Sequence, residues 1–265
     1  MAERQKSGIL TICGRPNVGK STLTNAFVGE KVAIVTNKPQ TTRNRICAIL
    51  NRGCCQFVFV DTPGLHRPRT RLGDYMVDVV KQSVSGVDGI LLLVEPIPNI
   101  GPPEEQLIAR IREENCPAVL VINKIDALER KEDLLAVIET YRKAYPFQAV
   151  VPLSARTGEG VEELLALLED WLPEGPPLFP EGMVSDQPER QMMAEILREK
   201  LLLCLEEEIP HGIAVAIDRM KMHNKVMHID ATVICERDSH KGIIIGKQGA
   251  MLKKIGSTAR FEIER

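Results

Sequence analysis

The sequence predicts an α/β domain with a mixed, mostly parallel sheet over residues 1–172, followed by a smaller α+β domain over residues 189–265. Short apolar runs that are mostly continuous rather than alternating indicate strands buried on both faces. These runs are Ile9–Cys13, Phe57–Val60, Ile90–Val94, Ala118–Ile122 and Ala149–Leu153. Helical patterns separate the runs, and strands that alternate with helices favour a parallel sheet covered on both sides.

The remaining elements follow from the same kind of pattern. In the first domain the expected helices are Lys20–Val28, Glu104–Glu114, Leu128–Tyr145 and Val161–Leu172. Ile46–Asn51 is expected to add an edge strand that pairs with Phe57–Val60. Five prolines and two glycines without a period make residues 173–188 a semi-rigid linker. The second domain is expected to contain a helix at Glu189–Glu208, strands at Ile213–Asp218 and Val226–Cys235, and then a glycine-rich helical region.

The composition limits the class of protein. Hydrophobic residues make up 44% of the 265 residues and charged residues 26%, which is ordinary for a globular protein and excludes extensive disorder. The formal net charge of −2 means that any binding of nucleic acid depends on a local basic patch. The seven cysteines show no C-x-x-C pair, so free thiols in a reducing compartment are expected. Because the sequence shows neither a secretory signal nor an apolar run of about 18 residues, a cytoplasmic location is expected.

A phosphate-binding loop is indicated by Gly14–Ser21, a complete G-x-x-x-x-G-K-S that follows a predicted strand and opens a predicted helix. The glycines let main-chain N–H groups point at phosphate oxygens, and the helix N-terminus favours an anion. Lys20 would neutralise the β- and γ-phosphates, and Ser21 would offer its hydroxyl to Mg²⁺. A chance glycine turn is the alternative. The nucleotide contacts expected in this region are Asn17, Val18, Gly19, Lys20, Ser21 and Thr22.

A second motif, Asp61-Thr62-Pro63-Gly64, comes directly after the predicted strand Phe57–Val60. An aspartate at the carboxyl end of a strand beside a phosphate loop can bind Mg²⁺, usually through water. Gly64 would bring its N–H against the γ-phosphate with no side chain in the way. Alone, this sequence could be a plain turn, but the phosphate loop upstream favours the functional interpretation.

The identity of the base is indicated by Asn123-Lys124-Ile125-Asp126, which follows another predicted strand. The carboxylate of Asp126 can accept from both N1–H and the N2 amino group of guanine, an arrangement that adenine lacks, so GTP is selected over ATP. Asn123 would tie this loop to the phosphate loop, and the stem of Lys124 would cover the base. A weaker signal is Ser154-Ala155-Arg156, where the N–H of Ala155 is expected to reach guanine O6.

A nucleotide-dependent switch is predicted within Lys38–Arg45, a polar segment without a period. A threonine there can bind Mg²⁺ and the γ-phosphate only while GTP is present, and Thr42 is favoured over Thr41. A solvated loop rich in threonine and arginine is the alternative. Ser21, Thr42 and Asp61 are thus the expected metal ligands. Many GTPases have a glutamine directly after D-x-x-G that orients the attacking water, but this chain has Leu65 there, so slow intrinsic hydrolysis is expected.

The groups expected to act in hydrolysis are Lys20, Thr42, Gly64 and Asn17. Asn17 is included as a hypothesis, because its side chain could hold a K⁺ ion that acts like an arginine finger in place of the missing glutamine.

Three segments carry a resemblance to a known family. They are K-P-Q-T-T-R at Lys38–Arg43, D-T-P-G-L-H at Asp61–His66 and E-E-I-P-H at Glu207–His211. Together they resemble the Era family of bacterial ribosome-assembly GTPases, and the likeness covers essentially the whole chain. It implies a Ras-like GTPase domain joined to a type II KH domain, with GTP or GDP and Mg²⁺ as ligands. It also implies binding to the 3′ end of 16S rRNA and to the 30S subunit precursor, and peripheral association with the inner membrane. A monomer is expected.

The second domain also shows an RNA-binding pattern. Gly246–Gly249 is a G-x-x-G between two predicted helices, which lets the backbone approach RNA phosphates. Residues 237–265 contain seven Lys or Arg against three Asp or Glu, a local charge of +4 in a chain of −2. The expected RNA contacts are Ile245, Gly246, Lys247, Gln248, Gly249 and Lys253. Because the family continues through a further strand and helix, the KH domain of this chain, which ends at Arg265, is expected to be incomplete at its C-terminus.

Two other functions are compatible with parts of the pattern. One is a regulatory switch whose GTP state controls protein or membrane partners, with the KH-like half as a docking surface. The other is a P-loop kinase for a small metabolite, against which the guanine motif Asn123–Asp126 argues.

Overall fold

The computed structural model describes residues 4–38, 41–65, 71–130, 132–205 and 212–264. The chain forms two compact units. The first comprises residues 1–33 and 42–186, and the second comprises residues 34–41 and 187–265. The short segment Ile34–Thr41 therefore packs with the C-terminal part of the chain, although the residues on both sides of it belong to the first unit.

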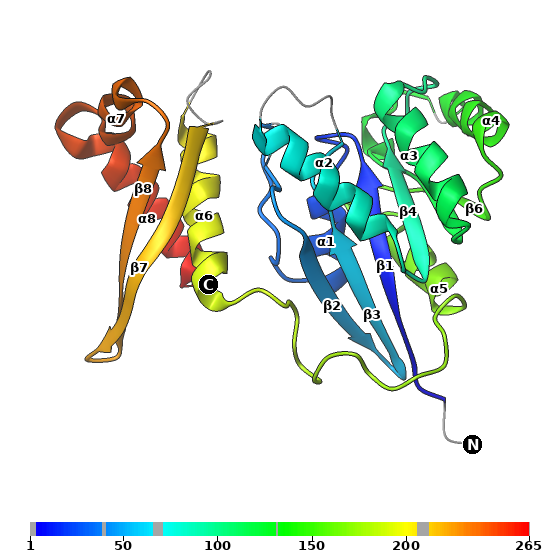
Figure 1. Ribbon diagram of the computed structural model, residues 1–265, viewed down its shortest axis with the longest axis horizontal. Coiled ribbons are helices and arrows are strands. Elements are labelled where there is room, and N and C mark those ends of the chain that lie inside the picture. The colour runs from blue at the N-terminus through cyan, green and yellow to red at the C-terminus, as the bar shows by residue number, and fades with distance from the viewer. Residues whose placement is uncertain (1–3, 39–40, 66–70, 131, 206–211, 265) are drawn as a thin grey trace. The chain divides into compact units, whose positions relative to one another are not determined.

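The first unit is built on a six-stranded sheet (Figure 1). Its strands, in spatial order, are β2 (Ile46–Arg52), β3 (Cys55–Asp61), β1 (Lys6–Gly14), β4 (Gly89–Val94), β5 (Ala118–Ile122) and β6 (Ala149–Pro152). Only β2, at one edge, is antiparallel to its neighbour, and all the other pairs are parallel. The mixed, mostly parallel sheet predicted from the apolar runs is therefore confirmed, and so is the edge position of β2.

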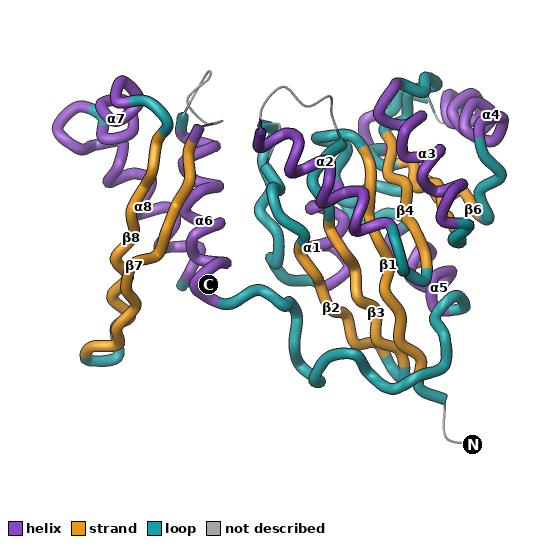
Figure 2. Tube along the Cα trace, in the orientation of Figure 1, coloured by secondary structure: helices purple, strands orange, loops and turns teal. Residues whose placement is uncertain are grey.

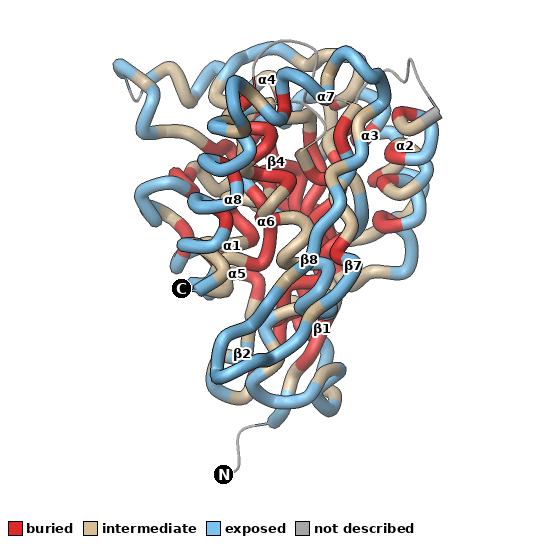
Figure 3. The backbone as a smooth tube through the Cα atoms, turned by 90° about the vertical axis from the view of Figure 1, so that its left-hand side faces the viewer, coloured by how far each residue is buried: buried red, intermediate tan, exposed pale blue. Residues whose placement is uncertain are grey.

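Helices cover both faces of this sheet (Figure 2). The helices are α1 (Lys20–Val28), α2 (Arg71–Val84), α3 (Pro102–Glu114), α4 (Asp133–Ala144) and α5 (Val161–Glu169). Alternate β4 residues, such as Ile90 and Leu92, share a core with residues of α2, α3 and α4. On α1, Phe27 stacks on Phe59 of β3 with ring centroids 4.2 Å apart. Buried residues accordingly concentrate on the strands of this unit (Figure 3).

Two helices differ from the prediction. α2 follows the D-x-P-G segment and was not predicted from the sequence. The helix predicted at Leu128–Tyr145 begins only at Asp133, because Ile125–Ala127 forms a 3₁₀ turn, η1, that ends at Leu128 in an extended conformation.

Most of the predicted linker, residues 173–188, is bound to the first unit. Main-chain hydrogen bonds join Val184 to Ile49 and Asp186 to Cys47, so this part of the linker pairs with edge strand β2. The buried side chain of Gln56 accepts from the N–H groups of Leu178 and Phe179, 2.7 and 2.9 Å away. The linker is thus an ordered strap along the sheet edge, at least as far as Asp186.

The second unit contains α6 (Glu189–Cys204), β7 (Ile213–His223), β8 (Val226–Cys235), α7 (Asp238–Ile245) and α8 (Ala250–Ile263), as well as a 3₁₀ turn, η3 (Lys247–Gly249). β7 and β8 form an antiparallel hairpin whose two-residue turn, Asn224–Lys225, has positive φ at both positions. Helices and hairpin share a small core that includes Leu201, Ile213, Ile244 and Ile255. β7 is longer than predicted. α6 is shorter than the predicted Glu189–Glu208, because it ends at Cys204 and Leu205 has an extended backbone.

Within the described ranges, no helix is long and apolar enough to cross a membrane.

Candidate functional site

The parallel sheet brings the sequence motifs to one edge, because the carboxyl ends of parallel strands lie together. The phosphate loop follows β1, and Asp61 ends β3. Asn123 follows β5 directly, and Ser154 comes two residues after β6. The register of the sheet pairs Ile12 with Asp61 and Val94 with Ile122, so these ends are level with one another.

Lys20 of the phosphate loop is held close to the loop backbone. Its side chain is 6% exposed, and Nζ donates to the carbonyls of Gly14 and Arg15, at 3.2 and 2.7 Å. Burial lowers the pKa of Lys20 to about 8, and the nearby Asp61 and Cys13 offset only part of this effect. A phosphate oxygen would stabilise this buried ammonium group, so the local electrostatics favour an anion in the loop.

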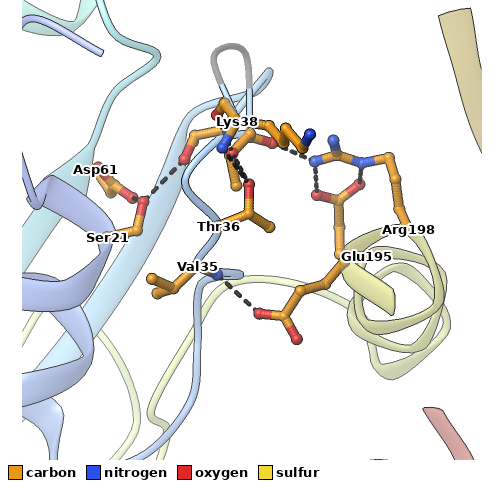
Figure 4. A network of polar contacts seen from close by, with 10 residues as sticks. Ser21, Val35, Thr36, Lys38, Asp61, Glu195 and Arg198 are labelled. Carbon is orange, nitrogen blue, oxygen red and sulfur yellow. Dashed lines mark hydrogen bonds and ion pairs between the residues drawn. The ribbon is translucent and has the colours of Figure 1, made fainter. Parts of the chain in front are cut away.

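A chain of three hydroxyl and carboxyl groups joins the phosphate loop, the predicted switch segment and β3 (Figure 4). Ser21 Oγ donates to Asp61 Oδ2 at 2.6 Å, and the Oγ1 atom of Thr42 lies 2.9 Å from Ser21 Oγ. Since a serine has a single hydroxyl proton, Thr42 is the donor to Ser21. Asp61 is completely buried, and Thr42 is buried as well. The three residues expected as metal ligands are therefore neighbours.

The surroundings of Asp61 suit a divalent cation. Burial raises the pKa of Asp61 to about 6, although Lys20, Ser21 and the main-chain N–H of Thr62 act in the opposite direction. Its second oxygen, Oδ1, is buried, and no described residue donates a hydrogen bond of normal geometry to it. A buried carboxylate with an unused oxygen beside two hydroxyls is a donor set that fits Mg²⁺, which prefers oxygen ligands and would also stabilise the ionised carboxylate.

Gly64 lies against the phosphate loop, and Leu65 lies in the core. A Cβ atom on Gly64 would lie 2.6 Å from the backbone of Pro16, so only glycine allows the D-x-P-G segment to approach the phosphate loop this closely. Leu65 is buried in the apolar core with Val80 and Leu107, and cannot orient water. Asn17 is exposed and has a left-handed backbone, with φ of 64°. Such strained positions are common in functional loops.

The side chain of Asn123 links the two halves of the predicted nucleotide site. Its Nδ2 donates to the carbonyl of Val18 in the phosphate loop at 2.8 Å, which is the tie predicted from the sequence. Its Oδ1 accepts from the N–H of Ala155 at 2.9 Å. The N–H of Ala155, which was predicted to reach guanine O6, therefore already has a partner, and any contact with the base would share or replace this bond.

Asp126 is held in its ionised form by its neighbours. Ser154 donates to Asp126 Oδ1 at 2.6 Å, and Arg156 pairs with Oδ2 at 2.5 Å. The hydrogen bond from Ser154 is the main cause that lowers the pKa of Asp126; burial acts against it, and the charge of Arg156 adds a smaller lowering. An ionised carboxylate accepts two hydrogen bonds from one edge of a base, which is the chemistry expected for guanine.

Two glutamates that were not predicted from the sequence also support the site. Glu95, directly after β4, accepts from Lys124 Nζ at 2.5 Å and lies 4.0 Å from the guanidinium of Arg15. Glu104, in the first turn of α3, is buried and forms an ion pair with Arg15. They fix Lys124 and the phosphate loop in place. The position of Glu95 at the carboxyl end of a strand was a signal that could have identified it.

The loop predicted to contact RNA lies between α7 and α8. Gly246 has φ of 72°, and a Cβ atom there would lie 2.6 Å from Cβ of Met251, so the turn requires glycine. Ile244 is buried in the core, whereas the residues on both sides of it, Ile243 and Ile245, are exposed. Lys247, Gln248, Lys253 and Lys254 are also exposed, and Gly249 is half-buried. Of the six predicted contacts, four are thus exposed, and the two glycines are half-buried.

Some sequence predictions cannot be located. Pro39, Gln40 and His66 lie outside the described residues, and so do residues 207–211 of the E-E-I-P-H segment.

Comparisons with known proteins place this site in a family. Residues 9–124 match the family model described as a 50S ribosome-binding GTPase, and residues 208–265 match the KH domain model. GTPase Era of Clostridium botulinum strain Alaska E43 is 51% identical over 98% of this chain and 88% of its own length. The chain belongs to the GTPase Era family. GTPase Era of Ruminiclostridium cellulolyticum is 48% identical, over 98% of this chain and 87% of the relative.

Solved Era structures share the fold. A crystal structure of Era in complex with MgGDPNP and nucleotides 1506–1542 of 16S ribosomal RNA has a TM-score of 0.94 at 40% identity, and covers 98% of this chain and 89% of that one. A variant of Aquifex aeolicus Era bound to GDP·AlF₄⁻ gives the same values. The predicted Ras-like GTPase domain followed by a KH domain is confirmed, and as a member of the Era family the protein is a GTPase.

The raised pKa of Asp61 predicts how pH affects the metal. A proton and Mg²⁺ compete for this carboxylate, so Mg²⁺ affinity of the GDP complex should be constant above pH 6 and fall about tenfold per pH unit below it. Titration of Mg²⁺ by calorimetry from pH 5 to 8 measures this. In Asp61→Asn the side chain cannot titrate, so the Mg²⁺ affinity should vary with pH only through the titration of the nucleotide. The same dependence of Mg²⁺ affinity on pH in both proteins would contradict the prediction.

Proposed function

We propose that this Era-family GTPase binds GTP with Mg²⁺ at the sheet edge described above, hydrolyses the GTP and releases GDP. We also propose that it uses its G-x-x-G loop to bind the 3′ end of 16S rRNA during assembly of the small ribosomal subunit. The observation that carries the first part is the chain of hydrogen bonds from Thr42 to Ser21 and from Ser21 to the buried Asp61 carboxylate. A switch residue at the metal site makes the segment sensitive to the γ-phosphate.

The proposed ligand set follows the geometry. Residues 17–22 and Gly64 would surround the phosphates, and Asn123, Lys124, Asp126, Ser154, Ala155 and Arg156 would form the guanine side. Ser21, Thr42 and Asp61 would hold Mg²⁺, which supplies positive charge to the β- and γ-phosphates when it is bound. Lys20 adds a second positive charge. These groups stabilise the charge that develops as the bond between the γ-phosphorus and its bridging oxygen breaks.

Hydrolysis by these residues should be slow without help. Water attacks the γ-phosphorus, and GDP and inorganic phosphate leave. The main-chain N–H of Gly64 would contact the γ-phosphate, but the buried Leu65 offers no group that orients the water. An additional positive charge from K⁺ near Asn17 or from a partner would compensate for this.

The RNA-binding part is supported by the family and by the exposed loop. The related Era structure that contains nucleotides 1506–1542 of 16S rRNA shows what that protein binds. In this chain, Lys247 and Lys253 are exposed beside two glycines that keep the loop backbone accessible. Backbone N–H groups and lysines would contact phosphates, and Ile245 and Gln248 would face the bases.

The wider assignments remain proposals. We divide the chain into a GTPase domain at residues 1–172, a linker at 173–188 and an RNA-binding domain at 189–265. We expect a monomer that acts in the cytoplasm on the 30S precursor. Peripheral association with the inner membrane, which the family resemblance implied, remains a prediction.

The guanine assignment predicts a change of base preference. In Asp126→Asn, the amide can donate to the carbonyl that xanthine carries in place of the guanine amino group, so GDP affinity should fall about 100-fold and xanthosine diphosphate should bind better. Asp133→Asn is the matched control, because Asp133 also pairs with an arginine, Arg130, at 3.2 Å. Calorimetry with both nucleotides measures the effect. Unchanged preference in the Asp126 variant would exclude this role.

The RNA assignment predicts the effect of a charge reversal. Lys247→Glu should weaken binding of an RNA with the sequence of the 16S 3′ end about tenfold or more, because one phosphate contact is lost and a repulsion is added. Lys81→Glu on α2 makes the same change of net charge elsewhere. Filter binding at one fixed salt concentration compares them. Equal binding by the two variants would instead favour a role for the KH domain in docking to protein or membrane partners.

The K⁺ hypothesis for Asn17 is tested by the choice of monovalent ion. GTP turnover should be several-fold faster in KCl than in NaCl at equal ionic strength, and Asn17→Ala should remove this difference. Equal turnover in the two salts for the unmodified protein would refute the hypothesis.

A further inference from the structure

The phosphate loop is tied to the rest of the first unit at two points. One is the carbonyl of Val18, which accepts from the side chain of Asn123 in the guanine motif. The other is Arg15, near the start of the loop, which forms an ion pair with Glu104 of α3. The side chain of Glu104 is only 1% exposed. The two residues between Arg15 and Val18 are therefore held from both sides.

Both oxygens of the Glu104 carboxylate have a partner. Oε1 faces the guanidinium of Arg15, and Oε2 accepts from the main-chain N–H of Gly101 at 3.2 Å, which closes the first turn of α3. Burial raises the pKa of the Tyr141 hydroxyl on α4, and the nearby charge of Glu104 raises it further. The carboxylate is thus held by its own helix beside α4, and it offers Arg15 an anchor of fixed position.

The main chain around Arg15 carries contacts of the nucleotide site. The carbonyl of Arg15 accepts from Lys20 Nζ at 2.7 Å. The preceding carbonyl, that of Gly14, accepts from the main-chain N–H of Leu65 at 3.2 Å. A peptide unit is planar, so the carbonyl of Gly14 and the Cα atom of Arg15 move together. An anchor on the Arg15 side chain therefore restricts both the loop and the D-x-P-G segment that is bonded to it.

The residue after Arg15 forms the surface against which Gly64 lies. An added Cβ atom on Gly64 would meet the backbone of Pro16 at 2.6 Å. Proline fixes its own φ and restricts the backbone of the residue before it, so the position of Pro16 follows closely from that of Arg15. A shift of Arg15 would consequently move the surface that sets the position of Gly64.

We propose that Glu104 is a positioning residue for GTP hydrolysis, which acts through Arg15 by fixing the part of the phosphate loop against which Gly64 lies. This inference rests on the proposed contact between the N–H of Gly64 and the γ-phosphate. GDP lacks that phosphate, and the other end of the loop is held separately through Val18 and Asn123. Loss of the anchor should therefore affect hydrolysis much more than GDP binding.

A purely stabilising role explains the charge of Glu104 less well. A neutral side chain with one carbonyl oxygen could equally accept from the N–H of Gly101 and close the first turn of α3. A buried ion pair also contributes little net stability compared with apolar side chains of similar size, since both charges lose their hydration. Glu95 is a weaker second partner for Arg15, because it lies 4.0 Å from the guanidinium and already accepts from Lys124.

The test compares single-turnover hydrolysis with GDP binding in variants of the full chain. Glu104→Gln keeps the size of the side chain and an acceptor for Gly101, but removes the charge that holds Arg15. Its rate at saturating GTP should fall about tenfold, on the scale of one lost contact to a charged group, while the Kd for GDP stays within about threefold. Glu104→Asp restores the charge and should recover part of the rate. The matched control is Glu105→Gln, an exposed glutamate in the same helical turn, which should keep the full rate.

A double variant tests whether Glu104 acts through Arg15. Arg15→Gln alone should lower the rate by a factor similar to that of Glu104→Gln. The protein that carries both changes should be no slower than the slower single variant, because each change removes the same bridge. Two independent effects would instead multiply to about a hundredfold loss, and that result would overturn the proposed route through Arg15.

The other outcomes separate this inference from the proposed function. A fast Glu104→Gln protein together with a slow Gly64→Ala protein would overturn the positioning role but keep the role of Gly64. If Gly64→Ala is as fast as the unmodified protein, the proposed γ-phosphate contact is wrong. Parallel losses of rate, GDP affinity and Tm, without recovery in Glu104→Asp, would assign Glu104 to stability alone. If Glu104→Gln does not fold, Arg15→Gln and Arg15→Lys, at a side chain that is 28% exposed, decide by the same criteria.

Discussion

The buried carboxylate of Asp61 is the group on which the arrangement of the site depends. It lies at the end of β3, one strand from the phosphate loop, and receives the hydroxyl of Ser21, which in turn receives that of Thr42. Burial disfavours its charge, so the ionised form gains from any cation beside it, whether Lys20 or a metal. The phosphate loop, the switch segment and β3 therefore meet at one carboxylate whose ionisation responds to what is bound.

Most of the fold followed from the sequence because the strands of the first unit are short apolar runs, buried on both faces, with amphipathic helices between them. The boundaries of β5, α1 and β8 were predicted correctly to the residue. α2 (Arg71–Val84) was not predicted. α4 was predicted too long because Leu128 fits the apolar period of the helix, although it has an extended backbone as the residue that ends the turn η1.

The site was predictable to the extent that its residues follow strands in one order along the chain. Motif spacing located Lys20, Ser21, Asp61, Asn123 and Asp126, and a parallel sheet brings such positions together whatever lies between them. Contacts across the fold were not predictable in this way. Nothing in the sequence near Arg15 indicates Glu104 as its partner, and nothing near Thr41 indicates Arg198, 157 residues further along the chain. Such pairings depend on tertiary packing and not on local pattern.

The strap formed by residues 173–186 has a consequence for how the molecule behaves toward its own copies. An edge strand presents unpaired N–H and carbonyl groups that can add a strand from another chain, which is a common route to aggregation. Along β2, the bonds of Val184 to Ile49 and of Asp186 to Cys47 occupy these groups. The segment that connects the two units thus also occupies main-chain groups of this edge strand, and a deletion within it would expose them to pairing with strands of other chains.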